Sequence, residues 1–168
     1  LLFPGERPEP LGVIGQVIPW NFPLLMAAWK IAPALAAGNT VVLKPAPDTP
    51  WAAASVAAIA ATETDLPPGV LNVVNSSDHA IGAMLSTDPR VDVVSFTGST
   101  ATGRKVMASA AETLKRVFLE LGGKSAFVVF EDFADVERAA KTVAGSMFFN
   151  QGESCNAPSR VLVHESIA

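Results

Sequence analysis

The single cysteine of the chain, Cys155, lies in a polar stretch, FFNQGESCNAPSR, that runs from Phe148 to Arg160. A lone free cysteine is often just a small buried apolar residue. The residues around Cys155, however, have the composition of a loop, without the period of a helix or a strand. A thiol in such a loop can act as a nucleophile if a neighbouring group removes its proton or favours the thiolate. The sequence therefore predicts nucleophilic chemistry at Cys155, and the rest of the chain must supply a base, an oxyanion site and an acceptor.

Three other polar side chains end or follow short apolar runs, and each has both a structural and a chemical interpretation. Glu120 follows an apolar run and precedes two glycines, so it is either an exposed carboxylate or a poised general base. Asn21 either caps the helix that follows it or donates its amide to an oxyanion. Lys44 is either a solvated lysine or a ligand for hydroxyl or phosphate groups.

The segment Gly98 to Lys105, GSTATGRK, is close to two phosphate-binding motifs but matches neither. A P-loop needs Lys directly after its second glycine, where this chain has Arg104, and the G-x-G-x-x-G fingerprint is also absent. What remains is a strand, a turn of glycine and hydroxyl residues, and the start of a helix. Such a turn can hold a pyrophosphate, but Ser99 or Thr100 could equally be an ordinary helix cap.

Short apolar runs alternate with helical stretches along the whole chain. We expect strands over residues 12–18, 40–43, 70–74, 91–97, 116–121 and 125–130 and from residue 160, and helices over residues 24–37, 49–64, 78–85, 100–111 and 135–149. This alternation is typical of βαβ units on a mainly parallel sheet. Ligands of such sheets bind beyond the carboxyl ends of the strands. Five of the candidate residues fall at or just after such ends: Asn21, Lys44, Gly98, Ser99 and Glu120.

The composition argues against several classes of function. The net charge is −4 with no basic block, which does not favour nucleic acid or an anionic membrane surface. The histidines, His79 and His164, stand apart from each other, so no metal site is expected. The longest apolar stretch, residues 24–37, is shorter than the roughly 20 residues that span a bilayer. One cysteine allows no internal disulfide and fits a reducing compartment, so we expect a cytoplasmic protein.

Five blocks, taken together and in this order, resemble the aldehyde dehydrogenase superfamily over nearly the whole chain. They are IPWNFP at Ile18–Pro23, LKPAPDTP at Leu43–Pro50, FTGSTATG at Phe96–Gly103, LELGGKS at Leu119–Ser125 and NQGESCNAPSR at Asn150–Arg160. The resemblance implies an α/β fold with a Rossmann-like, mainly parallel sheet flanked by helices, truncated at both ends. It also implies most of a dinucleotide-binding domain over residues 1–123 and the start of a catalytic domain over residues 124–168.

The resemblance implies a role for each matched catalytic residue. Cys155 would be the nucleophile that adds to an aldehyde, and Asn21 with the main-chain N–H of Cys155 would form the oxyanion hole. Glu120 would be the general base that activates water to hydrolyse the thioester. The implied reaction is oxidation of an aldehyde to a carboxylic acid, with NAD or possibly NADP as hydride acceptor, in a homo-oligomer of the full-length protein.

The same resemblance implies a set of cofactor contacts. Lys44 would hold the adenosine ribose, Ser99 would touch the pyrophosphate, and Gly98 would leave room for the nicotinamide end. The remaining expected contacts are Val17, Ile18, Pro19, Trp20, Pro47, Gly103 and Leu121.

Three departures from the family pattern qualify these expectations. Pro47 stands where the family often has a Glu that binds the ribose hydroxyls, so we expect weak discrimination between NAD and NADP. Glu153 stands two residues before the cysteine, where the family commonly has Gln. Members of the family are about three times longer, so we expect a fragment of a longer enzyme.

Two other readings stay open. A cysteine hydrolase or acyltransferase would need a histidine partner for Cys155, and a non-catalytic relative would keep the fold without the chemistry. A coenzyme-A-acylating enzyme of the same family needs no activated water, so Glu120 favours the hydrolytic branch.

Overall fold

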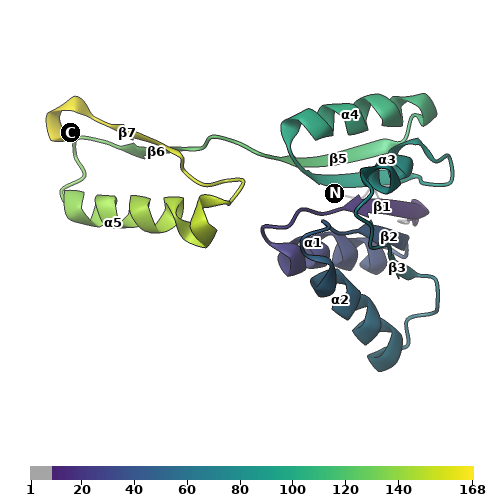
Figure 1. Cartoon of the computed structure of the whole chain (residues 1–168). Helices are drawn as coiled ribbons and strands as arrows, with labels where there is room; N and C mark the ends of the chain where they lie inside the picture. The colour runs from purple at the N-terminus through teal and green to yellow at the C-terminus, as the bar shows by residue number, and fades with distance from the viewer. Residues whose placement is uncertain (1–8) are drawn as a thin grey trace, which may run out of the picture. The chain divides into compact units, whose positions relative to one another are not determined.

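The computed structural model describes residues 9–168. The chain divides into two compact units, the first ending at Glu120 and the second comprising Leu121–Ala168. Within the described residues, the first unit is built on a larger sheet with the strand order β3-β2-β1-β4-β5, and the second on a smaller sheet of β6 and β7 (Figure 1).

Strands and helices alternate throughout the first unit, as the sequence predicts. Its elements are β1 (Val13–Val17), α1 (Pro23–Ala36), β2 (Thr40–Lys44), α2 (Pro50–Glu63), β3 (Leu71–Val73), α3 (His79–Thr87), β4 (Val93–Gly98), α4 (Thr100–Ala110), a 3-10 turn (Ala111–Thr113) and β5 (Arg116–Leu121). The pairs β1–β2, β1–β4 and β2–β3 are parallel. The expected α/β class with a mainly parallel sheet and flanking helices is therefore confirmed.

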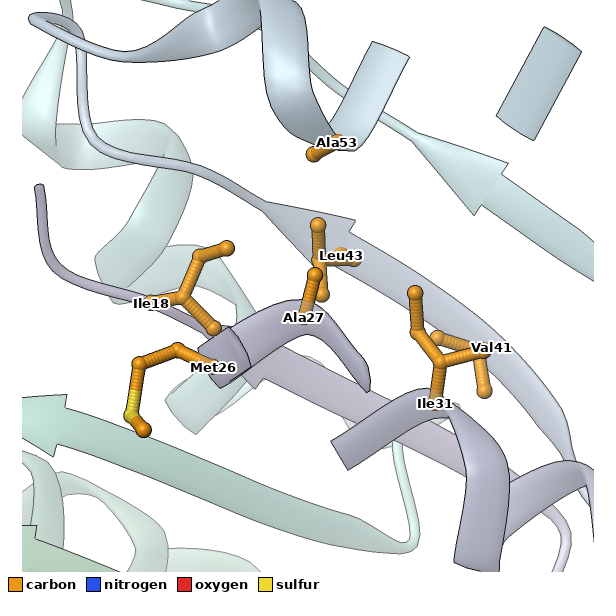
Figure 2. Packing of buried hydrophobic residues seen from close by; sticks show 7 residues of the cluster. All are labelled: Ile18, Met26, Ala27, Ile31, Val41, Leu43 and Ala53. Atoms are coloured by element: carbon orange, nitrogen blue, oxygen red, sulfur yellow. The ribbon is translucent and has the colours of Figure 1, made fainter. Parts of the chain in front are cut away.

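Helices cover the larger sheet on both faces: α1 and α2 lie on one side, and α3 and α4 on the other (Figure 1). The α1 side holds the buried apolar core, because alternate residues of β1 and β2 point towards these helices. Its members are Ile18, Met26, Ala27, Ile31, Val41, Leu43 and Ala53 (Figure 2). On the other face Gly15 allows close approach, since a Cβ added there would lie 3.1 Å from the Cβ of Leu85 in α3.

Helix starts differ from the expectation at one site residue. Helix α1 begins at Pro23 with Phe22 as its N-cap and has no side-chain cap. The interpretation of Asn21 as the cap of this helix is therefore wrong. Helices α3 and α4 do begin with side-chain caps, from Asp78 and Ser99, because these residues accept hydrogen bonds from main-chain N–H groups of the first turn.

The second unit is a βαβ arrangement in which the cysteine loop lies between the helix and the second strand. Its elements are β6 (Ala126–Val129), α5 (Val136–Met147), a turn segment (Phe149–Gly152), β7 (Arg160–Val163) and a 3-10 turn (Glu165–Ile167). Strands β6 and β7 are parallel, with Ala126 opposite Arg160. Helix α5 is capped by Asp135, which accepts a hydrogen bond from the main-chain N–H of Arg138 at 2.9 Å. The crossover helix thus delivers the chain to the segment that carries Cys155.

Candidate functional site

A cavity of about 450 Å³, here called the α3–α4 pocket, lies on the face of the larger sheet that carries α3 and α4. Strands β1, β2 and β4 contribute the residues at or near their carboxyl ends, and the two helices contribute the rest. The lining residues are Val17, Lys44, His79, Gly82, Ala83, Ser86, Phe96, Thr102, Lys105, Val106 and Ser109. Two of the expected cofactor contacts, Val17 and Lys44, are therefore brought together in one pocket.

Lys44 is almost fully buried in this pocket, with 4% of its surface exposed. Its ammonium donates a hydrogen bond to the carbonyl of Pro45 at 3.2 Å. Burial lowers the pKa of Lys44, and the negative charge of Asp78 partly opposes that shift. Helix α3 leaves space for the lysine, because a Cβ added at Gly82 would lie 3.3 Å from the Cδ of Lys44. The alternative of a solvated lysine does not fit this burial.

The start of α4 places Ser99 and Gly98 at the end of β4. The Ser99 Oγ accepts a hydrogen bond from the main-chain N–H of Thr102 at 3.2 Å and donates to the Thr102 Oγ1 at 3.0 Å. Ser99 thus acts as a helix cap in this structure. A Cβ added at Gly98 would lie 2.6 Å from the ring of Phe96, which lines the α3–α4 pocket. Phe96 therefore gives a packing reason for a glycine at this position.

The other expected cofactor residues of the first unit lie in varied surroundings. Ile18 is 2% exposed and its side chain belongs to the apolar core, which leaves its main chain for any cofactor contact. Trp20 is 47% exposed. Pro47 is exposed in the turn after β2, and Gly103 is buried within α4. Pro19 is half-buried after β1.

The opposite face of the larger sheet carries a second cavity, of about 430 Å³, here called the α1 cavity. Glu120 lines it from β5, and Lys30 lines it from α1. The Lys30 ammonium donates to the Ser95 Oγ at 2.7 Å, and the Gln16 side-chain amide donates to the Lys30 carbonyl at 2.7 Å. Burial lowers the pKa of Lys30 to about 8, and the negative charge of Glu120 opposes the shift. Glu120 is exposed while lining this cavity, which leaves the choice between base and surface carboxylate open.

Lys30 was not among the expected site residues. The available signal was a lysine in the middle of an otherwise apolar stretch, residues 24–37. Such a residue must either reach solvent or be buried beside a partner. The sequence alone does not distinguish these cases, because the rotation of the helix on the sheet decides which face the lysine occupies.

The second unit holds Cys155, whose side chain is exposed. The loop before it begins with residues in the left-handed region, with φ of 47° at Asn150, 60° at Gln151 and 78° at Gly152. Only glycine adopts this conformation without cost, and asparagine tolerates it better than most residues. A hydrogen bond from the main-chain N–H of Glu153 to the Asn150 carbonyl, at 3.0 Å, closes the turn. The predicted loop around the thiol is thus a tight, bonded segment.

The segment after Leu121 lies against the cysteine loop. A Cβ added at Gly123 would lie 3.4 Å from the main-chain carbonyl oxygen of Cys155. The Arg160 guanidinium donates to the Lys124 carbonyl at 2.9 Å, and its main-chain N–H donates to the Ser125 carbonyl at 3.2 Å. The end of the LELGGKS block, Gly123 to Ser125, is therefore held against the NQGESCNAPSR block within this unit.

The two histidines, His79 and His164, lie in different environments. The His164 Nδ1 is hydrogen bonded to the Ser166 Oγ at 2.9 Å and lies 3.6 Å from a carboxylate oxygen of Glu131. His79 lines the α3–α4 pocket in the first unit. Within residues 9–168, no group of three His, Cys, Asp or Glu side chains is placed where it could hold a metal ion. The helices in that range are also too short or too polar to cross a membrane.

Comparison with known proteins gives consistent results. The model of the "Aldehyde dehydrogenase family" matches residues 5–168. The chain is 52% identical to a probable betaine aldehyde dehydrogenase of Schizosaccharomyces pombe, over 97% of this chain and 32% of that protein. It is 50% identical to the NADP/NAD-dependent aldehyde dehydrogenase PuuC of Escherichia coli, over 95% of this chain and 32% of that protein.

Solved structures that are similar to this chain give the same result. A structure of PnpE in complex with nicotinamide adenine dinucleotide has a TM-score of 0.89 and 47% identity, covering 95% of this chain and 32% of that one. A γ-glutamyl-γ-aminobutyraldehyde dehydrogenase from Burkholderia cenocepacia J2315 has a TM-score of 0.91 and 53% identity, with the same coverage. The chain spans about a third of the length of these relatives. On the fold, the motif blocks and the family match, this chain belongs to the aldehyde dehydrogenase family.

Proposed function

We propose that the complete protein oxidises an aldehyde to a carboxylic acid, with NAD as the hydride acceptor and NADP as an alternative. The observation that carries the proposal is the conjunction of the family match over residues 5–168 with an exposed thiol, Cys155, in a loop bonded to the LELGGKS segment. Residues 1–123 would form most of the dinucleotide-binding domain, and residues 124–168 would begin the catalytic domain.

The α3–α4 pocket fits the adenosine end of such a cofactor. It offers a buried lysine, Lys44, at a strand end, and its volume of about 450 Å³ suits a nucleoside rather than a single ion. Its charged lining residues include Lys44 and Lys105, and none of its described lining residues is Asp or Glu. Asp78, whose charge acts on Lys44, is not among the lining residues, so no carboxylate of the lining itself repels a 2′-phosphate. This lining supports use of both nucleotides.

The proposed reaction assigns each step to a side chain of this chain. The Cys155 thiolate adds to the aldehyde carbon, while the Asn21 amide and the main-chain N–H of Cys155 donate hydrogen bonds to the developing oxyanion. When bound, NAD accepts the hydride that converts the adduct to a thioester. Glu120 then takes a proton from water, the hydroxide adds to the thioester carbon, and the acid leaves as the Cys155 thiolate is released.

Lys44 would hold the adenosine ribose, and Ser99 at the start of α4 would face the pyrophosphate. A helix N-terminus suits an anion, because its main-chain N–H groups and dipole favour negative charge. Ser99 already bonds Thr102, so its hydroxyl would have to serve both roles or leave the phosphate to the main chain. Gly98, Gly103, Pro47 and Leu121 remain proposed contacts, as do Val17, Ile18, Pro19 and Trp20.

We also propose a homo-oligomer for the complete protein. The names of the relatives guide the choice of substrate: they include betaine aldehyde and aminoaldehyde dehydrogenases, such as aminoaldehyde dehydrogenase 2 of Zea mays. Other relatives carry peroxisomal or mitochondrial in their names. The cytoplasm is therefore a prediction for this protein that fractionation of the source cells would test.

The proposal is tested with the complete protein and a panel of aldehydes that starts with betaine aldehyde and ω-aminoaldehydes. We expect formation of NADH and of the matching carboxylic acid in equal amounts. The Cys155→Ala variant should lose turnover while still binding NADH. Normal turnover by this variant would contradict the assignment of the nucleophile, and acyl transfer that needs no nucleotide would favour a hydrolase instead.

A further inference from the structure

The wall of the α3–α4 pocket contains a second lysine, Lys105, which comes from α4. One face of this helix lines the pocket through Thr102, Lys105, Val106 and Ser109. Residues at positions i, i+3, i+4 and i+7 share one face of a helix, as these four do. Arg104 is exposed and is not among the lining residues. The packing of α4 on the sheet therefore places Lys105, and not its neighbour Arg104, at the pocket.

The two lysines of the pocket differ in how free their ammonium groups are. Lys44 is almost fully buried, and its ammonium already donates to the Pro45 carbonyl at 3.2 Å. Lys105 is exposed, and it takes part in no salt bridge among residues 9–168. An exposed lysine has a long flexible stem, so its ammonium can move towards an anion. The pocket thus combines one fixed cation with one that can follow a ligand.

The charges around the pocket suit a ligand that carries more than one negative charge. A phosphate monoester has a charge of about −1.5 to −2 near neutral pH. Lys44 supplies a single positive charge, and the negative charge of Asp78 acts on it. A phosphate beside Lys44 therefore needs a further cation. Lys105 is such a cation, and none of the described lining residues is Asp or Glu.

We propose that Lys105 pairs with the 2′-phosphate of NADP and so determines how well the complete protein binds this nucleotide. The inference rests on the proposed function, in which the α3–α4 pocket takes the adenosine. NAD has a hydroxyl in place of that phosphate, so Lys105 contributes little to its binding. Pro47 only lacks the repulsion that a carboxylate would supply, whereas Lys105 adds an attraction that is specific to NADP.

The test measures dissociation constants for NADPH and NADH by nucleotide fluorescence, in the complete protein and in its Lys105→Gln variant. We expect the constant for NADPH to rise by about three- to tenfold, between the scale of an exposed ion pair and that of a hydrogen bond to a charged group. The constant for NADH should change by less than about twofold. Added salt should weaken NADPH binding more in the parent than in the variant, because salt screens the ion pair that the variant lacks.

Arg104→Gln is the matched control, because it removes the same charge from the neighbouring residue, which does not line the pocket. It should leave both constants within about twofold of the parent values. Lys105→Arg keeps the charge and should keep most of the affinity for NADPH. Both residues are exposed, so neither glutamine variant should change the melting temperature measured without nucleotide.

Several outcomes would overturn the inference. Unchanged NADPH affinity in Lys105→Gln is one, and equal losses for NADPH and NADH in that variant are another, since they would mark a role in the pocket that is independent of the 2′-phosphate. Equal losses of NADPH affinity in Arg104→Gln and Lys105→Gln would point to the net charge of α4 instead. A parent that binds NADH but not NADPH would overturn the inference alone. A parent that binds neither would overturn the proposed function as well.

Discussion

Among residues 9–168, Lys30 and Lys44 are both almost fully buried, with 9% and 4% of their surface exposed, but they lie on opposite faces of the larger sheet. Lys30 projects from α1 into the α1 cavity and bonds a side-chain hydroxyl, Ser95, at 2.7 Å. Lys44 ends β2 in the α3–α4 pocket and bonds a main-chain carbonyl, that of Pro45, at 3.2 Å. Each face thus presents one buried ammonium to a cavity.

The pKa values of the two lysines are lowered to different extents. Burial lowers both pKa values, and a carboxylate opposes the shift in each case: Glu120 for Lys30 and Asp78 for Lys44. Only the pKa of Lys30 falls as far as about 8, although its exposed fraction is the larger. The exposed fraction alone therefore does not determine how far each pKa falls. The amount of protein packed around the ammonium group also lowers the pKa. The protein therefore disfavours the charged ammonium more strongly on the α1 face than on the α3–α4 face.

The largest expected effect tests the proposed role of Glu120, which lines the α1 cavity, as the general base. In the complete protein, Glu120→Gln should lower kcat by about 10²–10⁴, because the amide cannot take a proton from water. The affinity for NADH should change little, since Glu120 lies on the face away from the α3–α4 pocket. Steady-state kinetics and NADH fluorescence measure the two quantities. An unchanged kcat and pH profile would make Glu120 a structural carboxylate.

The next effect concerns Asn21, which follows β1. Asn21→Ala should lower kcat by about 10²–10³, the usual loss when one oxyanion donor is removed. Phe22 and not Asn21 is the N-cap of α1, so the variant should lose no helix cap. A large drop in melting temperature with normal kcat would show that the Asn21 amide supports the fold and not the oxyanion.

A smaller effect concerns how the contribution of Lys30 to stability depends on pH. The unfolded chain holds the Lys30 proton up to a pH of about 10.5, but the folded chain releases it near pH 8. Folding therefore carries a penalty that is fully present below pH 8 and is relieved as the pH rises from 8 to 10.5. The scale of this penalty is about 3 kcal/mol. Lys30→Met removes it, so the variant should melt several degrees above the parent at pH 7, and the gain should shrink by pH 9.5.

Lys44→Met provides the control from the other face. It should weaken NADH binding while leaving kcat at saturating nucleotide nearly unchanged, because Lys44 is assigned to the ribose. Lys30→Met should leave NADH affinity as it is. If Lys30→Met lowers the melting temperature at pH 7, the hydrogen bond to Ser95 outweighs the burial of charge, and the contrast between the faces is smaller than we infer.

The smallest expected effect is at Pro47, which is exposed in the turn after β2 and does not line the α3–α4 pocket. Pro47→Glu should lower kcat/KM for NADP by about fivefold relative to NAD, the scale of one like-charge pair near solvent. The parent should use both nucleotides. A parent that already prefers NAD by more than about a hundredfold, roughly 2.7 kcal/mol, would show that another residue excludes NADP.

The order of elements and the family were predictable from the sequence. Alternation of apolar strands with helices specifies a βαβ pattern through local periodicity, and every expected strand of the first unit appears within two residues of its predicted position. The position of Lys44, Gly98 and Glu120 at or next to strand ends was also predictable, because β2, β4 and β5 end at Lys44, Gly98 and Leu121. The loop character of the segment around Cys155 followed from its composition alone.

Tertiary structure decided which polar side chains are buried and what they touch. The bond of Lys30 to Ser95 joins residues that are 65 positions apart, and it depends on how α1 is rotated on the sheet. The unpartnered hydroxyl of Ser86 and the packing of Phe96 against Gly98 likewise arise only when helices and strands are in place. Local sequence sets helix and strand periods, but burial and pKa depend on neighbours that come from elsewhere in the chain, because desolvation and hydrogen bonding act through space.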